Sequence, residues 1–122
     1  MQKSFDFTFT FERLDAYQIS RELTRITAQV AATIPRGYGY LTDHLLRSGS
    51  APARLIAEGA LRSTKGSKRQ RFSEALGECG EAVATAQQAL DLRVISESQY
   101  DQLRSIAARV AAMTSRLVRK FS

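Results

Sequence analysis

The chain has 122 residues, of which 43% are hydrophobic and 25% are charged, and its formal net charge is +6. This length fits one domain, and a domain of this size buries roughly two-thirds of its unfolded surface. A single cysteine excludes an internal disulfide framework, and one cysteine with one histidine argues against a structural zinc site.

The sequence favours a cytoplasmic protein with acidic partners. No apolar run approaches the roughly 18 residues of a membrane span, so we expect no membrane partner. The segment from Met1 to Asp6 lacks the apolar stretch of a secretory signal. A sequence pI near 10.0 points to nucleic acid first, ahead of acidic proteins and membrane surfaces.

Residues 1–11 are predicted to form an extended N-terminal arm. Phenylalanine occupies positions 5, 7, 9 and 11 and alternates with polar residues. A period of two with β-forming residues is typical of extended backbone. A single strand with an all-Phe face is not stable alone in water. The arm therefore either folds onto its own domain or packs on a neighbouring subunit, and the sequence leaves both open.

Four apolar stripes with steps of three or four residues predict four helices. They run over residues 16–30, 41–56, 72–90 and 100–121. Pro52 lies inside the second stripe and removes a backbone donor, so we expect a kink or break near Ser48–Gly49. Glycines and alanines in the third stripe would let a neighbouring helix approach closely.

The helix ends and connections predict the topology. Ser96 and Gln99 fit a capping box, so the fourth helix should span residues 97–120, about 36 Å. The third helix begins after Thr64 or after Ser67. Short connections force sequential helices to be antiparallel. The sequence therefore predicts an all-α, up-down-up-down four-helix bundle, with residues 1–122 as a single domain and residues 1–11 as its arm.

The positive charge is concentrated in the middle of the chain. Residues 36–72 hold eight basic and two acidic residues, which accounts for the whole net charge of +6. No acid follows Asp101, and Arg109 and Arg116 are seven residues apart on one helix face. Phosphate contact is one interpretation, and a solvated loop and helix face is the other. The candidate nucleic-acid-binding residues are Arg62, Lys65, Lys68, Arg69 and Arg71, with Arg109 and Arg116 as a second group.

No constellation of residues predicts catalysis. His44 is next to Asp43, but adjacent residues do not face each other on a helix. Cys79 is in phase with the apolar stripe and is expected to be a small core residue. Phosphate-binding loops, nucleophile elbows and paired-histidine motifs are absent from the sequence. We therefore expect a protein that is not an enzyme, with no cofactor and no metal.

Four segments of the sequence carry a family resemblance. They are residues 11–18, the motif Ile56-Ala57-Glu58-Gly59, residues 62–77 with Ser63-Thr64-Lys65 and Arg71-Phe72, and Ile95-Ser96 with Tyr100, Leu103 and Met113. In this order and spacing they resemble the four-helix-bundle family of 23S rRNA intervening-sequence proteins. Retroelement accessory proteins that assist a reverse transcriptase are similar.

The resemblance implies a left-handed bundle, often assembled as a homopentamer, with a basic surface that contacts RNA or DNA and with no enzymatic activity. It also implies that Gly59 follows the end of the second helix and that Glu58 pairs with an arginine such as Arg62. Similar accessory proteins bind a reverse transcriptase and its RNA template. The alternative function is therefore a protein-interaction scaffold for a partner such as a reverse transcriptase.

Overall fold

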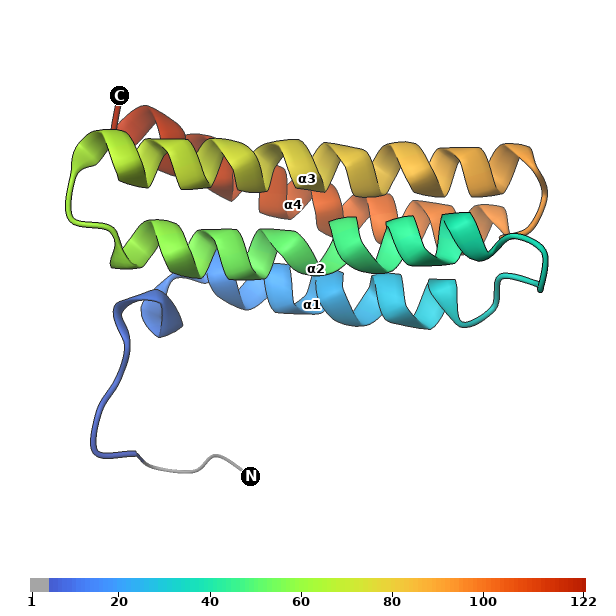
Figure 1. The fold of residues 1–122 in the computed structure, drawn as a ribbon, viewed down its shortest axis with the longest axis horizontal. Helices are drawn as coiled ribbons and strands as arrows, with labels where there is room; N and C mark the ends of the chain where they lie inside the picture. Colours follow the sequence, from blue (N-terminus) through green and yellow to red (C-terminus); the bar gives the residue numbers. More distant parts are fainter. Residues whose placement is uncertain (1–4) are drawn as a thin grey trace.

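The computed structural model describes residues 5–122 and contains four long helices after a short 3-10 turn (Figure 1). The turn, η1, spans Thr10–Arg13, and the helices are α1 (Asp15–Ala31), α2 (Gly39–Leu61), α3 (Lys65–Asp91) and α4 (Glu97–Lys120). No strand occurs in residues 5–122. The all-α prediction is confirmed, and α4 has the predicted bounds.

The helices alternate in direction, which confirms the up-down-up-down bundle. α1 packs on α2 and α4, and α3 packs on the same two helices. The α2–α3 connection, the start of α1 and the end of α4 lie at one end of the bundle (Figure 1). The other two connections lie at the opposite end. Among the described residues, no helix is long and apolar enough to cross a membrane.

Side-chain caps set two helix starts. Ser96 Oγ accepts a hydrogen bond from the Gln99 amide at 3.1 Å, and the Ser96 amide donates to Gln99 Oε1 at 2.8 Å. The predicted capping box is therefore confirmed. Of the two starts left open for α3, the structure has Thr64, whose Oγ1 accepts from the Ser67 amide at 3.2 Å.

The buried face of α3 is built from smaller residues than the sequence predicted. Leu76, Val83 and Leu90 are only half-buried. The fully covered positions of this helix are Phe72, Ala75, Cys79, Ala82, Thr85, Ala86 and Ala89. Small side chains let α2 and α4 approach closely, so the alanines occupy the centre and the larger residues lie at its edges.

α2 differs from its prediction at two places. The helix runs without a break past Ser48–Gly49 and through the buried Pro52. The loss of one backbone hydrogen-bond donor does not end α2, because packing against α1 and α3 stabilises the helix. Gly59 lies within the helix rather than after its end, because the chain stays helical to Leu61. A Cβ at Gly59 would lie 2.6 Å from Phe72 Cε1, so glycine permits the close approach of α3.

The described part of the arm does not fold onto its own bundle. Phe5, Phe7 and Phe9 are 73%, 68% and 49% exposed. Only Phe11 packs on a helix, with its ring centroid 4.8 Å from that of Tyr17. Residues 1–4 of the predicted arm lie outside the described residues.

Replacing Gly59 by alanine should destabilise the bundle by about 1–3 kcal/mol, because the added methyl group meets the Phe72 ring. The matched control is Gly77→Ala on α3, where a Cβ meets nothing within 4 Å. That change should raise stability by about 0.5–1 kcal/mol. Urea unfolding measures both, and equal effects of the two changes would contradict the close approach.

Candidate nucleic-acid interface

The α2–α3 connection and the C-terminal turn of α4 lie together. The ring centroids of Phe72 and Phe121 are 5.8 Å apart, which ties the start of α3 to the end of α4. Lys68 Nζ lies 5.6 Å from the Phe121 centroid. The two basic segments of the sequence are therefore neighbours, which sequence spacing alone did not establish.

We call this part of the surface the basic end and define it by its exposed cations. These are Arg62, Lys65, Arg69, Arg116, Arg119 and Lys120. No ion pair involves any of them within residues 5–122. Arg119 and Lys120 were not among the predicted binding residues, although the absence of acids after Asp101 was the signal that could have found them. Four of the seven candidates fall in this set.

The side chain of Lys68 is hydrogen-bonded to the end of α2. Its ammonium group donates hydrogen bonds to the Ala60 carbonyl at 2.9 Å and to the Gly59 carbonyl at 3.4 Å. These carbonyls belong to the last turn of α2, where the backbone supplies few further donors, and the Gly59 carbonyl also accepts from the Arg62 amide at 3.3 Å. A cation at the negative end of the helix dipole is favourable. Lys68 therefore caps α2 from α3.

The charge of Arg71 is compensated. Its guanidinium lies 2.9 Å from Glu74 Oε2 and 3.6 Å from Glu58 Oε2. Glu58 also lies 3.6 Å from Arg54. The expected pairing of Glu58 with Arg62 is wrong, because Arg62 caps the end of α2 with extended backbone while Arg71 approaches from α3.

Arg109 lies away from the basic end. It is exposed and shares a face of α4 with Arg116. At 1.5 Å per residue it is about 18 Å along the helix from Phe121. The nearby Ala107 carbonyl accepts a hydrogen bond from Cys79 Sγ at 3.1 Å, which places this part of α4 beside the middle of α3.

His44 and Cys79 form no common site. Burial raises the pKa of the Cys79 thiol to about 11, so the thiol stays protonated in the core. His44 Nδ1 lies 3.3 Å from the Arg47 guanidinium. Desolvation and the neighbouring Glu81 raise the pKa of Glu78, which faces this polar cluster from α3. Among the described residues, no group of three or more potential metal ligands comes together.

Replacing Lys68 by methionine should destabilise the protein by about 1 kcal/mol, because two carbonyls of α2 lose their charged donor. Lys65→Met, at the exposed first position of α3, is the control and should cost nothing. Thermal unfolding compares the two. Equal stability of both variants would contradict the capping role.

The fold and the sequence are both similar to those of known proteins. A solved protein of unknown function from the S23 ribosomal protein family of Bacteroides thetaiotaomicron superposes with a TM-score of 0.79. The match covers 85% of this chain and 98% of that chain at 14% identity, so it shows a shared fold. The search of curated proteins gives no match. The profile of the 23S rRNA-intervening sequence protein family matches residues 12–116. The chain therefore belongs to the 23S rRNA-intervening sequence protein family.

Proposed function

We propose that this protein is a non-enzymatic, self-associating cytoplasmic accessory protein that binds RNA or DNA backbones through the basic end. The observation that carries the proposal is the set of exposed, uncompensated cations there, with Arg62, Lys65 and Arg69 at its centre. A basic side chain that pairs with a carboxylate of its own fold adds little to the binding of a polyanion. These three side chains make no such ion pair within residues 5–122.

The chemistry of the basic end suits phosphate rather than bases. Arginine guanidinium groups bind phosphate oxygens in a bidentate manner, and each neutralised phosphate releases condensed counterions. Exposed Ser63 and Gln70 add hydrogen-bond donors, whereas Thr64 and Ser67 bond to each other at 2.7 Å within the cap of α3. Backbone contacts of this kind position a nucleic acid and carry no sequence information. Binding without base specificity follows.

Two further observations support the proposal. The description of the family names 23S rRNA, which favours RNA as the polyanion. The exposed phenyl rings of the arm favour self-association, for which the family resemblance suggests a homopentamer. The non-enzymatic part rests on His44 and Cys79, which lack the nucleophile–base geometry that catalysis needs.

The direct test is the triple variant Arg62→Glu/Lys65→Glu/Arg69→Glu. Its affinity for a structured RNA should fall roughly 10- to 100-fold at moderate salt, since about three phosphate contacts are lost. The slope of log K against log salt should become shallower by about 2 to 3. Fluorescence anisotropy across a salt series measures both quantities.

The matched control is Arg36→Glu/Arg93→Glu/Arg104→Glu, which changes the net charge equally at exposed positions away from the basic end. It should retain most of the affinity. Equal losses in the two triple variants would mean that net charge, and no particular surface, governs binding. If neither variant weakens binding, the basic end is not the interface.

The alternative, a scaffold for a protein partner such as a reverse transcriptase, makes a different prediction. Its partner would remain bound in a pull-down after nuclease treatment, and the wild-type protein would not bind RNA at low salt. A partner that is lost after nuclease treatment would support contact through nucleic acid.

A further inference from the structure

The arm carries a continuous row of aromatic rings that its own bundle leaves uncovered. The centroids of Phe7 and Phe9 are 5.1 Å apart, and those of Phe9 and Phe11 are 5.8 Å apart. Phe11 in turn contacts Tyr17 of α1. Between this row and α1 lies an open hollow of about 520 Å³ rather than a packed interface. Burying exposed phenyl rings removes apolar surface from water, so such a row favours association with another surface.

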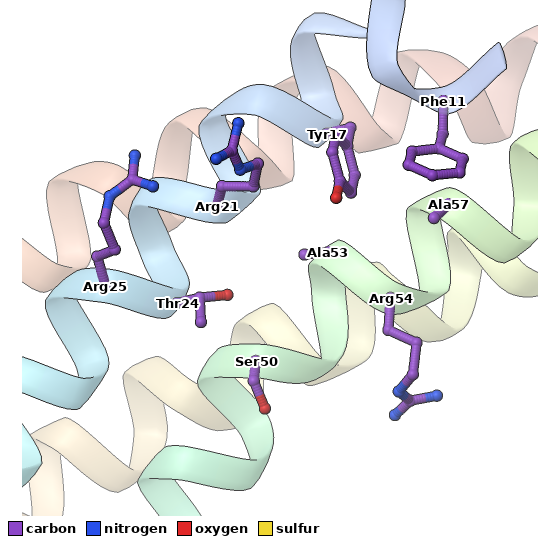
Figure 2. Close-up of a pocket in the computed structure, with 9 residues that line it drawn as sticks. All are labelled: Phe11, Tyr17, Arg21, Thr24, Arg25, Ser50, Ala53, Arg54 and Ala57. Atoms are coloured by element: carbon purple, nitrogen blue, oxygen red, sulfur yellow. The ribbon is translucent and has the colours of Figure 1, made fainter. Parts of the chain in front are cut away.

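A second hollow, the α1–α2 groove, begins where the arm joins the bundle (Figure 2). Its volume is about 410 Å³. Tyr17 and Phe11 line one part of it, and small α2 side chains, including Ala53 and Ala57, form its floor. Its remaining lining includes Arg21, Arg25 and Arg54, of which Arg54 lies 3.6 Å from Glu58, whereas no ion pair involves Arg21 or Arg25 within residues 5–122. The groove is thus apolar inside and positively charged at its rim.

These properties match the arm in chemistry and in length. An occupant should bring aromatic rings and a negative charge, and the segment Phe5-Asp6-Phe7 has both. Arginine at the rim can pair with Asp6 and can lie over a phenyl face. Alternate side chains of an extended segment are about 6.6 Å apart, and the groove floor from Ser50 to Ala57 is about 10.5 Å long. The groove therefore accepts two successive rings.

The arm of the same chain is directed elsewhere. Phe9 donates its amide hydrogen to Glu12 Oε1 at 3.2 Å, and its carbonyl accepts from the Glu12 amide at 3.0 Å. This turn fixes the direction in which the chain leaves η1, and the arm extends away from the helices (Figure 1). The groove is consequently open to another molecule.

We propose that the arm of one copy, through Phe5 and Phe7, docks in the α1–α2 groove of a second copy. Two docked rings bury roughly 300–500 Å² of the arm and a similar area of the groove, which together reach the lower end of a specific interface. The inference rests on the self-association part of the proposed function and names the surfaces that would produce it. It makes no use of the basic end, so the two can fail separately.

A mixed crosslinking experiment tests the contact. Two differently tagged proteins are prepared, one carrying Phe7→Cys and the other Ala53→Cys, and both are oxidised together. The buried Cys79 serves as an internal check, because the wild-type protein should stay unlinked. We expect a disulfide-linked heterodimer, at least tenfold above the yield from Phe7→Cys mixed with Ala112→Cys, whose altered position is exposed on α4. Equal yields from both pairs would overturn the proposal.

The mass in solution provides the second measurement. The variant Phe5→Ser/Phe7→Ser/Phe9→Ser should dissociate into smaller species, with a dissociation constant raised at least tenfold. The control Leu46→Ser/Leu92→Ser removes exposed apolar side chains away from the arm and should keep the wild-type mass. An arm variant with wild-type mass overturns the inference, and if that variant also loses RNA affinity, the arm stacks on bases instead. Retained RNA binding by a dissociated arm variant supports both proposals.

Discussion

The position of the basic end depends on the contact between Gly59 and Phe72. Because Gly59 has no Cβ, the Phe72 ring lies directly against α2, and α3 begins close to the point where α2 ends. The same ring packs on Phe121, which holds the last turn of α4 beside the α2–α3 connection. Lys68 reaches from α3 to the terminal carbonyls of α2 and passes near the Phe121 ring. Three helix termini are thereby fixed at one end of the bundle.

This arrangement divides the basic residues into two groups. Lys68 and Arg71 satisfy carbonyls and carboxylates of their own fold, so their charge holds helices together. Arg62, Lys65 and Arg69 are exposed and make no ion pair within residues 5–122. A charge reversal at Lys68 or Arg71 would therefore confuse a loss of stability with a loss of binding. The exposed residues offer the cleaner test of function.

The sequence predicted those features that depend on local patterns. Helical spacing of apolar residues located all four helices, and the Ser96–Gln99 pair located the start of α4. The sequence did not predict side-chain roles that depend on contact with another helix. The role of Lys68 depends on carbonyls of α2, and the partner of Glu58 is an arginine on α3. The alanines of α3 lie in the core because α2 and α4 approach this helix closely. The hydrophobicity of single residues does not predict how closely two helices approach.

The central claim is that the basic end binds nucleic acid through phosphates. The most direct measurement is the affinity of the wild-type protein for a structured RNA and for a duplex DNA across a salt series, with the protein mass determined in the same buffer. The account predicts micromolar or tighter binding to both, weakening steeply with salt on a slope of roughly −3 or steeper. Absence of binding at low salt by a protein that still self-associates would contradict it.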